Sequence, residues 1–333
     1  MSVFLWIMVL VAAALAAHWG ADKIAEPLKK LRQMWGLSEA AGAAFVALAT
    51  ASPEVGTNIV SAAQGLKDIG LGNLLGSNII SVPAIVTVAY IASRKGSRNG
   101  SSSNRRRRRD RAMRVKPEAL YVQALPYLAI IALAALLTVP KPWRGLQPID
   151  GWIMFIAYFI YLAQAILRQR QNGESVEWTK KEVIAATLGI VTLGLGAYFT
   201  VTATENIVSA LGISEIIGGL FITSTMSIAP EVFATWSVAK SGQVTSATTN
   251  VIADNTVTMT LAFVPLALVG LPIDNMLLFT VNLSFVALLG AVYALLIYQG
   301  TEKYSFELWE VATLIGVYLL YLIIMIFWVL PLL

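Results

Sequence analysis

Apolar residues in this chain form long blocks that are separated by short polar segments. They do not alternate with polar residues every two to four positions, as they do in the helices and strands of soluble proteins. Blocks of about 17 to 25 apolar residues are long enough to cross a bilayer as helices. The first block has no basic residue before it, so we interpret it as a membrane span, not as a signal peptide. We therefore predict an all-α membrane protein with ten transmembrane helices, near residues 2–19, 37–64, 69–93, 119–138, 149–168, 181–204, 213–240, 244–271, 274–298 and 306–331.

The composition supports a membrane protein and argues against most enzyme classes. Of the 333 residues, 57% are hydrophobic and only 13% are charged, far from the balance of a soluble domain. Cysteine is absent, and His18 is the single histidine, which leaves too few ligands for a zinc site and no histidine-based triad. We also considered a membrane-embedded hydrolase, but the sequence shows no pair of a nucleophile and a base that such an enzyme would need. We expect neither an enzyme nor a bound cofactor.

The basic residues predict the orientation of the spans. With the Arg-rich segment 94–116 in the cytoplasm, 21 of the 24 lysines and arginines fall in cytoplasmic loops, and only Lys67, Lys141 and Arg144 lie outside. This bias follows the positive-inside rule. The prediction is a multi-pass protein of the cell membrane with both termini outside.

The run Arg105 to Arg109 lies in a stretch rich in Gly, Ser and Asn, between two membrane spans. Such a segment suits a cytoplasmic linker that rests on anionic lipid headgroups, and we do not expect it to bind nucleic acid. The linker, 94–118, separates residues 1–93 from the fourth and fifth helices at 119–168. A second cytoplasmic loop, 169–180, precedes the second half at 181–333.

The two halves contain related sequences. Residues 36–42, Gly-Leu-Ser-Glu-Ala-Ala-Gly, match 212–218, Gly-Ile-Ser-Glu-Ile-Ile-Gly, at four of seven positions. Residues 53–83 match 230–260 at an offset of 177, so one residue is inserted between Phe221 and Pro230. The predicted topology makes the repeats, 36–83 and 212–260, antiparallel. We expect two inverted five-helix repeats with helices 2 and 7 broken at Pro53 and Pro230, which is the architecture of secondary transporters.

Three carboxylates lie deep within predicted spans, at Glu54, Glu231 and Asp254. An acid at the centre of a membrane helix costs about 2.5 to 3.5 kcal/mol on insertion scales, which makes each a candidate functional residue. No lysine or arginine lies at the same depth. Their countercharge must therefore be a bound cation or protons.

Further oxygen ligands are predicted around these acids. A proline has no N–H, so Pro53 and Pro230 should each free the carbonyl four residues earlier. Hydroxyl residues lie four positions before each glutamate, and two polar ladders follow at a spacing of four. Oxygen-only sites suit hard ions such as Ca²⁺ or Na⁺, and Mg²⁺ or Mn²⁺ stay open. The additional candidate ligands are the carbonyls of Ala49 and Met226, the hydroxyls of Thr50 and Ser227, and the ladders Asn73, Ser77, Ser81 and Asn250, Asp254, Thr258.

These motifs resemble those of the cation/calcium exchanger superfamily, and most closely its sodium/calcium exchanger branch. The first repeat carries Ala-Thr-Ala-Ser-Pro-Glu at 49–54 and Gly-Asn-Leu-Leu-Gly-Ser-Asn at 72–78. The second repeat carries Met-Ser-Ile-Ala-Pro-Glu at 226–231 and Thr-Asn-Val-Ile-Ala-Asp-Asn at 249–255. The resemblance implies that Glu54 and Glu231 are the central Ca²⁺ ligands, with Thr50 and Ser227 beside them and Ser77 as a Na⁺ ligand.

The chain also departs from the family pattern. Asp254 replaces the usual serine of the second repeat, and Ser81 and Thr258 stand where an amide or acid is common. We therefore expect a secondary active antiporter that exchanges a divalent cation, Ca²⁺ in the first place, for Na⁺ or H⁺ by alternating access. The alternatives are a proton-coupled exporter of Mn²⁺ or Mg²⁺, and a cation channel.

Overall fold

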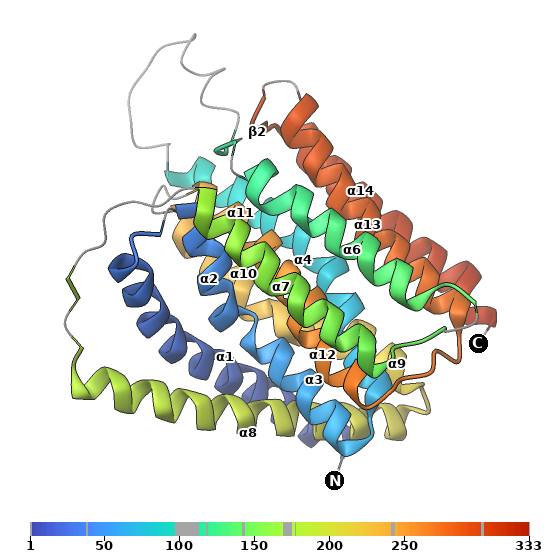
Figure 1. The fold of residues 1–333 in the computed structure, drawn as a ribbon. Helices are drawn as coiled ribbons and strands as arrows, with labels where there is room; N and C mark the ends of the chain where they lie inside the picture. Colours follow the sequence, from blue (N-terminus) through green and yellow to red (C-terminus); the bar gives the residue numbers. More distant parts are fainter. Residues whose placement is uncertain are drawn as a thin grey trace.

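The computed structural model describes residues 2–37, 39–96, 113–117, 119–141, 144–168, 175–176, 178–240, 244–300 and 303–332, nearly all of them helical (Figure 1). The first half contains α1 (Val3–Met34), α2 (Glu39–Thr50), α3 (Ser52–Gln64), α4 (Lys67–Gly96), the π-helix η2 (Ala119–Ala124), α6 (Leu125–Thr138) and α7 (Pro148–Arg168). The second half contains α8 (Lys180–Leu211), α9 (Glu215–Ile217), the π-helix η3 (Gly218–Thr223), α10 (Ser224–Lys240), α11 (Val244–Val257), the π-helix η4 (Thr258–Ala262), α12 (Phe263–Leu268), α13 (Met276–Gln299), α14 (Leu308–Ile324), the π-helix η5 (Met325–Val329) and the 3₁₀ turn η6 (Leu330–Leu332).

Most of these helices can cross a membrane. Nine spans in the described part of the chain are long and apolar enough to do so, which confirms a multi-pass membrane protein. Helices α2 and α3, with 12 and 13 residues, are each too short to cross alone. Together they rise by about 37 Å at about 1.5 Å per residue, which is enough for one further crossing.

The long helices α1 and α8 run beside each other (Figure 1). The prediction ended the first span at residue 19, but α1 continues to Met34, since its backbone hydrogen bonds do not stop where charged side chains begin. Glycines bring the two backbones together. A Cβ atom at Gly20 would lie 2.4 Å from the Gly189 carbonyl oxygen, and one at Gly196 would lie 2.7 Å from the Ala13 carbonyl oxygen, so this pair depends on small residues.

Helix α4 forms the centre of the bundle. Every residue from 71 to 79 is buried, and α4 contacts η3, α10, α11, α13 and α14. A Cβ atom at Gly72 would lie 2.3 Å from the Ile216 carbonyl oxygen, and one at Gly219 would lie 2.3 Å from the Ile69 carbonyl oxygen. The motif glycine of the first repeat therefore holds α4 against the second half of the molecule.

The two predicted breaks differ. Helix α2 ends at Thr50, Ala51 is not helical, and α3 begins with Pro53 in its first turn, which confirms the break there. The break predicted at Pro230 is wrong, because α10 runs continuously from Ser224 to Lys240 through this proline. At the first site the Ser52 hydroxyl bonds the Ala49 carbonyl oxygen at 2.6 Å. Its counterpart at offset 177 is Ala229, which has no hydroxyl with which to stabilise an open chain.

Each end of the bundle carries a short link between the halves. At one end, β1 (Met113–Arg114) pairs antiparallel with β2 (Ser305–Phe306), a pairing that the sequence did not suggest. At the other end, the backbones of Leu146 and Leu271 bond each other, and Lys67 caps the carbonyls after α12. Both chain ends lie away from the β1–β2 pair (Figure 1).

Parts of the predicted loops are not described. The basic run Arg105 to Arg109 and its lipid contacts lie outside the described residues, as do residues 169–174 and 177 of the second cytoplasmic loop.

Candidate cation-binding site

The three predicted acids lie on three helices that meet inside the bundle. Glu54 is in the first turn of α3, Glu231 follows the proline of α10, and Asp254 is on α11. Glu54 is 1% exposed and Asp254 is 7% exposed, while Glu231 is half-buried. Glu231 is close enough to both other acids to interact electrostatically. Within the described part of the chain, the salt bridges involve other residues, so these acids have no fixed cationic partner.

The two predicted hydroxyls bond across the halves of the molecule. Thr50, the last residue of α2, donates to Asp254 Oδ1 on α11. Ser227 on α10 donates to Asn73 Oδ1 on α4 at 3.4 Å. Each hydroxyl thus contacts the polar ladder of the opposite repeat, which brings residues about 150 to 200 positions apart into one site.

Several buried polar atoms near the acids have no hydrogen-bond partner in the described structure. They are both carboxylate oxygens of Glu54, the Oδ1 atom of Asn58, and the Nδ2 atoms of Asn73 and Asn255. A buried polar group without a partner costs about 1 to 3 kcal/mol, and a charged one costs more. The Glu54 oxygens are therefore free to bind a cation or a proton.

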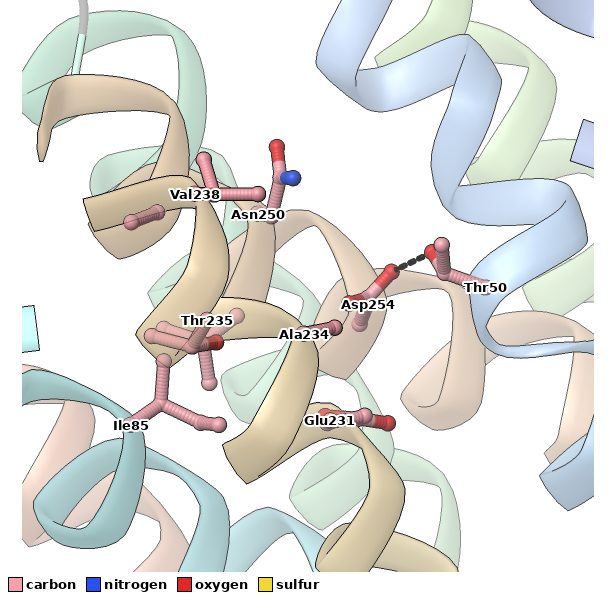
Figure 2. Close-up of a pocket in the computed structure, with 10 residues that line it drawn as sticks. Thr50, Ile85, Glu231, Ala234, Thr235, Val238, Asn250 and Asp254 are labelled. Carbon is pink, nitrogen blue, oxygen red and sulfur yellow. Dashed lines mark hydrogen bonds between the residues drawn. The ribbon is translucent and has the colours of Figure 1, made fainter. Parts of the chain in front are cut away.

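A cavity of about 70 Å³ lies beside the acids, between α10 and α11. Figure 2 shows Asp254 turned toward Thr50 and Glu231 lower in the same cavity. The cavity continues from these acids to Val238 and Ala247. Its lining residues are Thr50, Ile85, Glu231, Ala234, Thr235, Val238, Ala247, Asn250, Val251 and Asp254.

The far end of the cavity faces the β1–β2 pair. The Thr248 carbonyl, beside Ala247, accepts a hydrogen bond from Tyr293, whose ring lies 5.5 Å from that of Phe306 in β2. The cavity therefore leads from the acids toward one defined end of the bundle.

Other predicted ligands lie outside this cavity. Ser81 donates to Asn255 Oδ1 at 2.9 Å, and Thr258 accepts from Asn78 Nδ2 at 2.8 Å. These two ladder members join the repeats to each other. The Ser77 hydroxyl bonds back to the Leu74 carbonyl, as hydroxyls in membrane helices commonly do.

The two residues whose carbonyls are predicted ligands, Ala49 and Met226, have different surroundings. The Ala49 carbonyl accepts the Ser52 hydroxyl, and a second lone pair stays available. The Met226 side chain packs on a small cluster of α1 and α8 residues, Leu10, Ala203 and Ile207. In the described part of the chain, no three histidine, cysteine or acidic side chains approach closely enough to hold a metal ion. Assignment of these residues as ligands stays a prediction.

The structure adds residues that the sequence analysis did not place in the site. Tyr127 donates to Asn78 Oδ1 at 3.0 Å, and His18 Nε2 lies 2.7 Å from the Ser227 carbonyl oxygen. Asn78 and Asn255 match each other between the repeats, and this match could have indicated that their amides belong to the site. Nothing in the sequence indicated that His18 on α1 reaches Ser227 on α10.

Comparison with known proteins identifies the family of the chain. The profile of the sodium/calcium exchanger protein family matches residues 5–167 and 181–327. The chain belongs to this family. The resemblance found in its motifs is thereby confirmed. This family member is 21% identical over 244 residues, 72% of its own length and 73% of the other chain, to the uncharacterized membrane protein MJ0091 of Methanocaldococcus jannaschii.

Solved exchanger structures share the fold. One structure of the sodium-calcium exchanger NCX_Mj superposes with a TM-score of 0.67 at 19% sequence identity, covering 96% of this exchanger-family chain and 99% of that chain. The H⁺/Ca²⁺ exchanger CAX superposes with a TM-score of 0.71 at 14% identity, covering 97% of this chain and 80% of that chain. At such identities the likeness is one of fold.

Proposed function

We propose that this chain is a secondary active antiporter that exchanges Ca²⁺ for Na⁺ or H⁺ across the membrane by alternating access. The observation that carries the proposal is the group of buried acids without a fixed cationic partner, headed by Glu54, whose two oxygens have no hydrogen-bond partner among the described residues. Such acids in a membrane helix are stabilised by a mobile cation or by protons. Oxygen ligands favour hard ions such as Ca²⁺.

The relatives support the same class of transport. NCX_Mj is a sodium-calcium exchanger and CAX is an H⁺/Ca²⁺ exchanger. Both move Ca²⁺ against a monovalent ion, so Ca²⁺ is the shared substrate and the coupling ion is what differs.

Packing between α1 and α8 supports the proposed inverted repeat. Gly20 packs on the carbonyl of Gly189, and Gly196 packs on the carbonyl of Ala13. Adding 176 to 20 gives 196, and adding 176 to 13 gives 189. The two contacts therefore exchange places under the offset that relates the glycine motifs 36–42 and 212–218, as expected of two copies related by a twofold axis.

The site contains the same relation. Asn78 bonds Thr258, and Ser81 bonds Asn255. An offset of 177 converts 78 into 255 and 81 into 258, so the two hydrogen bonds also exchange places. The match of the family profile to two separate parts of the chain is consistent with a duplication.

The proposed topology has ten crossings, with the broken pair α2–α3 providing the tenth and both termini outside. The β1–β2 end of the bundle is then cytoplasmic, and the linker 94–118 lies there on anionic lipid. Because the cavity leads to this side, the proposal assigns it to a conformation open toward the cytoplasm. A second conformation would open the site to the outside.

Asp254 is the proposed determinant of the coupling ion. Three acids carry up to three negative charges, whereas one Ca²⁺ supplies only two positive charges. The remaining charge must be met by Na⁺ or H⁺. Asp254 is a carboxylate where the family has a serine, so it adds a group that can bind a proton. This favours H⁺ as the coupling ion. In this form of the proposal, Mn²⁺ or Mg²⁺ are the alternative substrates.

A flux measurement tests the function. Purified protein in liposomes is loaded with Ca²⁺, Mn²⁺ or Mg²⁺, and ion movement is followed under imposed Na⁺ and H⁺ gradients. We expect Ca²⁺ movement driven uphill by one of the two gradients. Downhill movement without any countergradient would indicate a channel, and absence of movement for all three ions would refute the proposal.

The variant Asp254→Asn tests coupling in the same assay. It should change the dependence of flux on Na⁺ or H⁺ more than it lowers the amount of folded protein, because it removes one charge from the site. Unchanged ion dependences would show that Asp254 is a bystander facing a hydrated cavity.

A further inference from the structure

The single histidine of the chain contacts the backbone of the candidate site. His18 lies on α1, and its Nε2 atom is 2.7 Å from the carbonyl oxygen of Ser227 on α10. A carbonyl oxygen only accepts hydrogen bonds, so Nε2 carries the hydrogen and donates it. The hydroxyl of the same Ser227 bonds Asn73. His18 therefore holds the main chain of a residue whose side chain belongs to the cation site.

Helix α10 is weakened at Met226, one residue before the contact with His18. Pro230 lies inside the helix and supplies no N–H to the carbonyl four residues earlier, so helical hydrogen bonding is weakened around residues 226 and 227. In the first half, Ser52 satisfies the carbonyl exposed by the matching proline. The counterpart of Ser52 is Ala229, which cannot do so. His18 does not replace it, because it donates to the next carbonyl, that of Ser227, and so anchors α10 from α1 beside the carbonyl that Pro230 leaves without a helical donor.

The contact has no equivalent in the other half. Under the offset of 176 that relates α1 to α8, His18 corresponds to Gly194, which has no side chain, and no atom lies within 4 Å of a Cβ built there. The counterpart of Ser227 is Thr50, which bonds Asp254 instead. The histidine thus makes the two ion-binding helices unequal.

We infer that His18 is a positioning residue for the cation site: by donating to the Ser227 carbonyl it holds the part of α10 that carries the Ser227 hydroxyl and the Glu231 carboxylate. This inference rests on the proposed antiport function. The Nε2 atom of His18 cannot bind a cation, because it carries the hydrogen that it donates to the Ser227 carbonyl. Its loss should therefore weaken cation binding while leaving the ligands present.

The test compares three variants in the full-length protein. His18→Leu removes the donor and keeps an apolar side chain of moderate size, His18→Gln keeps an N–H donor, and Trp19→Leu changes the exposed neighbour on the same helix. Two quantities are measured for each: the Ca²⁺ concentration for half-maximal exchange with the maximal rate, and Ca²⁺ binding to detergent-purified protein by titration calorimetry.

We expect His18→Leu to raise the half-maximal Ca²⁺ concentration and the dissociation constant by about three- to tenfold, the effect of one lost hydrogen bond, with the maximal rate changed less. His18→Gln should recover most of this loss, and Trp19→Leu should match wild type. Equal loss in the Leu and Gln variants, or a lower rate with unchanged binding, would overturn the inference. If wild type itself neither exchanges nor binds Ca²⁺, the proposed function fails, which is a separate outcome.

Discussion

The two helices that carry the glutamates, α3 and α10, have matching motifs but different surroundings. Glu54 on α3 is sealed, whereas its counterpart Glu231 on α10 lines a cavity. Helix α3 packs closely on α8, because a Cβ atom at Gly56 would lie 3.0 Å from a Leu193 methyl carbon. The counterpart of Gly56 is Phe233, which is 76% exposed.

If the halves are inverted repeats, as proposed, this difference suggests how two matching sequences give the protein two conformations. The glutamate is buried away from the cavity in the first half, and its counterpart lines the cavity in the second half. If the halves exchanged their conformations, the open side would become the closed one, which is the principle of alternating access in inverted repeats. The comparison can be tested by treating the two halves with matched substitutions.

The largest expected effect comes from the two glutamates. Glu54→Gln and Glu231→Gln should each abolish Ca²⁺ exchange in proteoliposomes, a loss of at least about a hundredfold, because each removes a charged oxygen that no other residue replaces. Both variants should stay folded in size-exclusion chromatography, since each neutralises a buried acid. The exposed Glu26→Gln is the control. Near-normal exchange in either variant would show that the halves do not contribute equivalent ligands.

Accessibility should differ strongly between matched positions. Ala234 is exposed and lines the cavity, whereas its counterpart Thr57 is 3% exposed. In this cysteine-free chain, Ala234→Cys should react with a small thiol reagent at least about tenfold faster than Thr57→Cys, and Ca²⁺ should slow the first reaction. Equal labelling rates would remove the evidence for a cavity open on one half only.

Packing between α1 and α8 should respond to side chains at Gly20 and Gly196. Gly20→Val and Gly196→Val place atoms against the opposite backbone and should destabilise the protein by about 1 to 3 kcal/mol each. Gly194→Val has open space and is the matched control. The measurement is the melting temperature in detergent, followed by tryptophan fluorescence. Similar melting temperatures for all three would contradict the twofold packing.

The smallest effect is expected from the linker 94–118, which lies within the first half, between α4 and η2 in the sequence. Replacing Arg105 to Arg109 with serine should leave the exchange rate unchanged within about twofold, since the linker supplies no ligand. Attraction to anionic vesicles should fall, because each basic residue near such a surface contributes about 1 kcal/mol. Loss of exchange in well-inserted protein would mean that the linker takes part in the difference between the halves.

The general plan of the molecule was predictable because it follows from strong, repeated patterns. Membrane spans come from apolar length, and the acids stand out because charged groups are costly in a bilayer. The same length argument missed the extension of α1 beyond residue 19, where polar residues continue a helix that packs on α8.

The features that the sequence did not indicate depend on single contacts. Whether a proline breaks a helix or only weakens it depends on a nearby donor, which Ser52 provides and Ala229 does not. Ser81 and Thr258 have the spacing of ligands and also bond amides of the opposite repeat, a contact that the spacing does not indicate, and their assignment as ligands stays a prediction. The contact of His18 with Ser227 joins residues 209 positions apart, and periodicity cannot indicate such a distance.

The π-helix η3 lies where the two halves differ in length. The offset between the halves is 176 at Gly42 and Gly218 but 177 at Pro53 and Pro230, and η3 (Gly218–Thr223) lies in the interval where it changes. A π turn accommodates one extra residue within a continuous helix. On the proposed duplication, the wider turn takes up the one-residue difference in length, so the proline and glutamate downstream keep their places relative to their own helix.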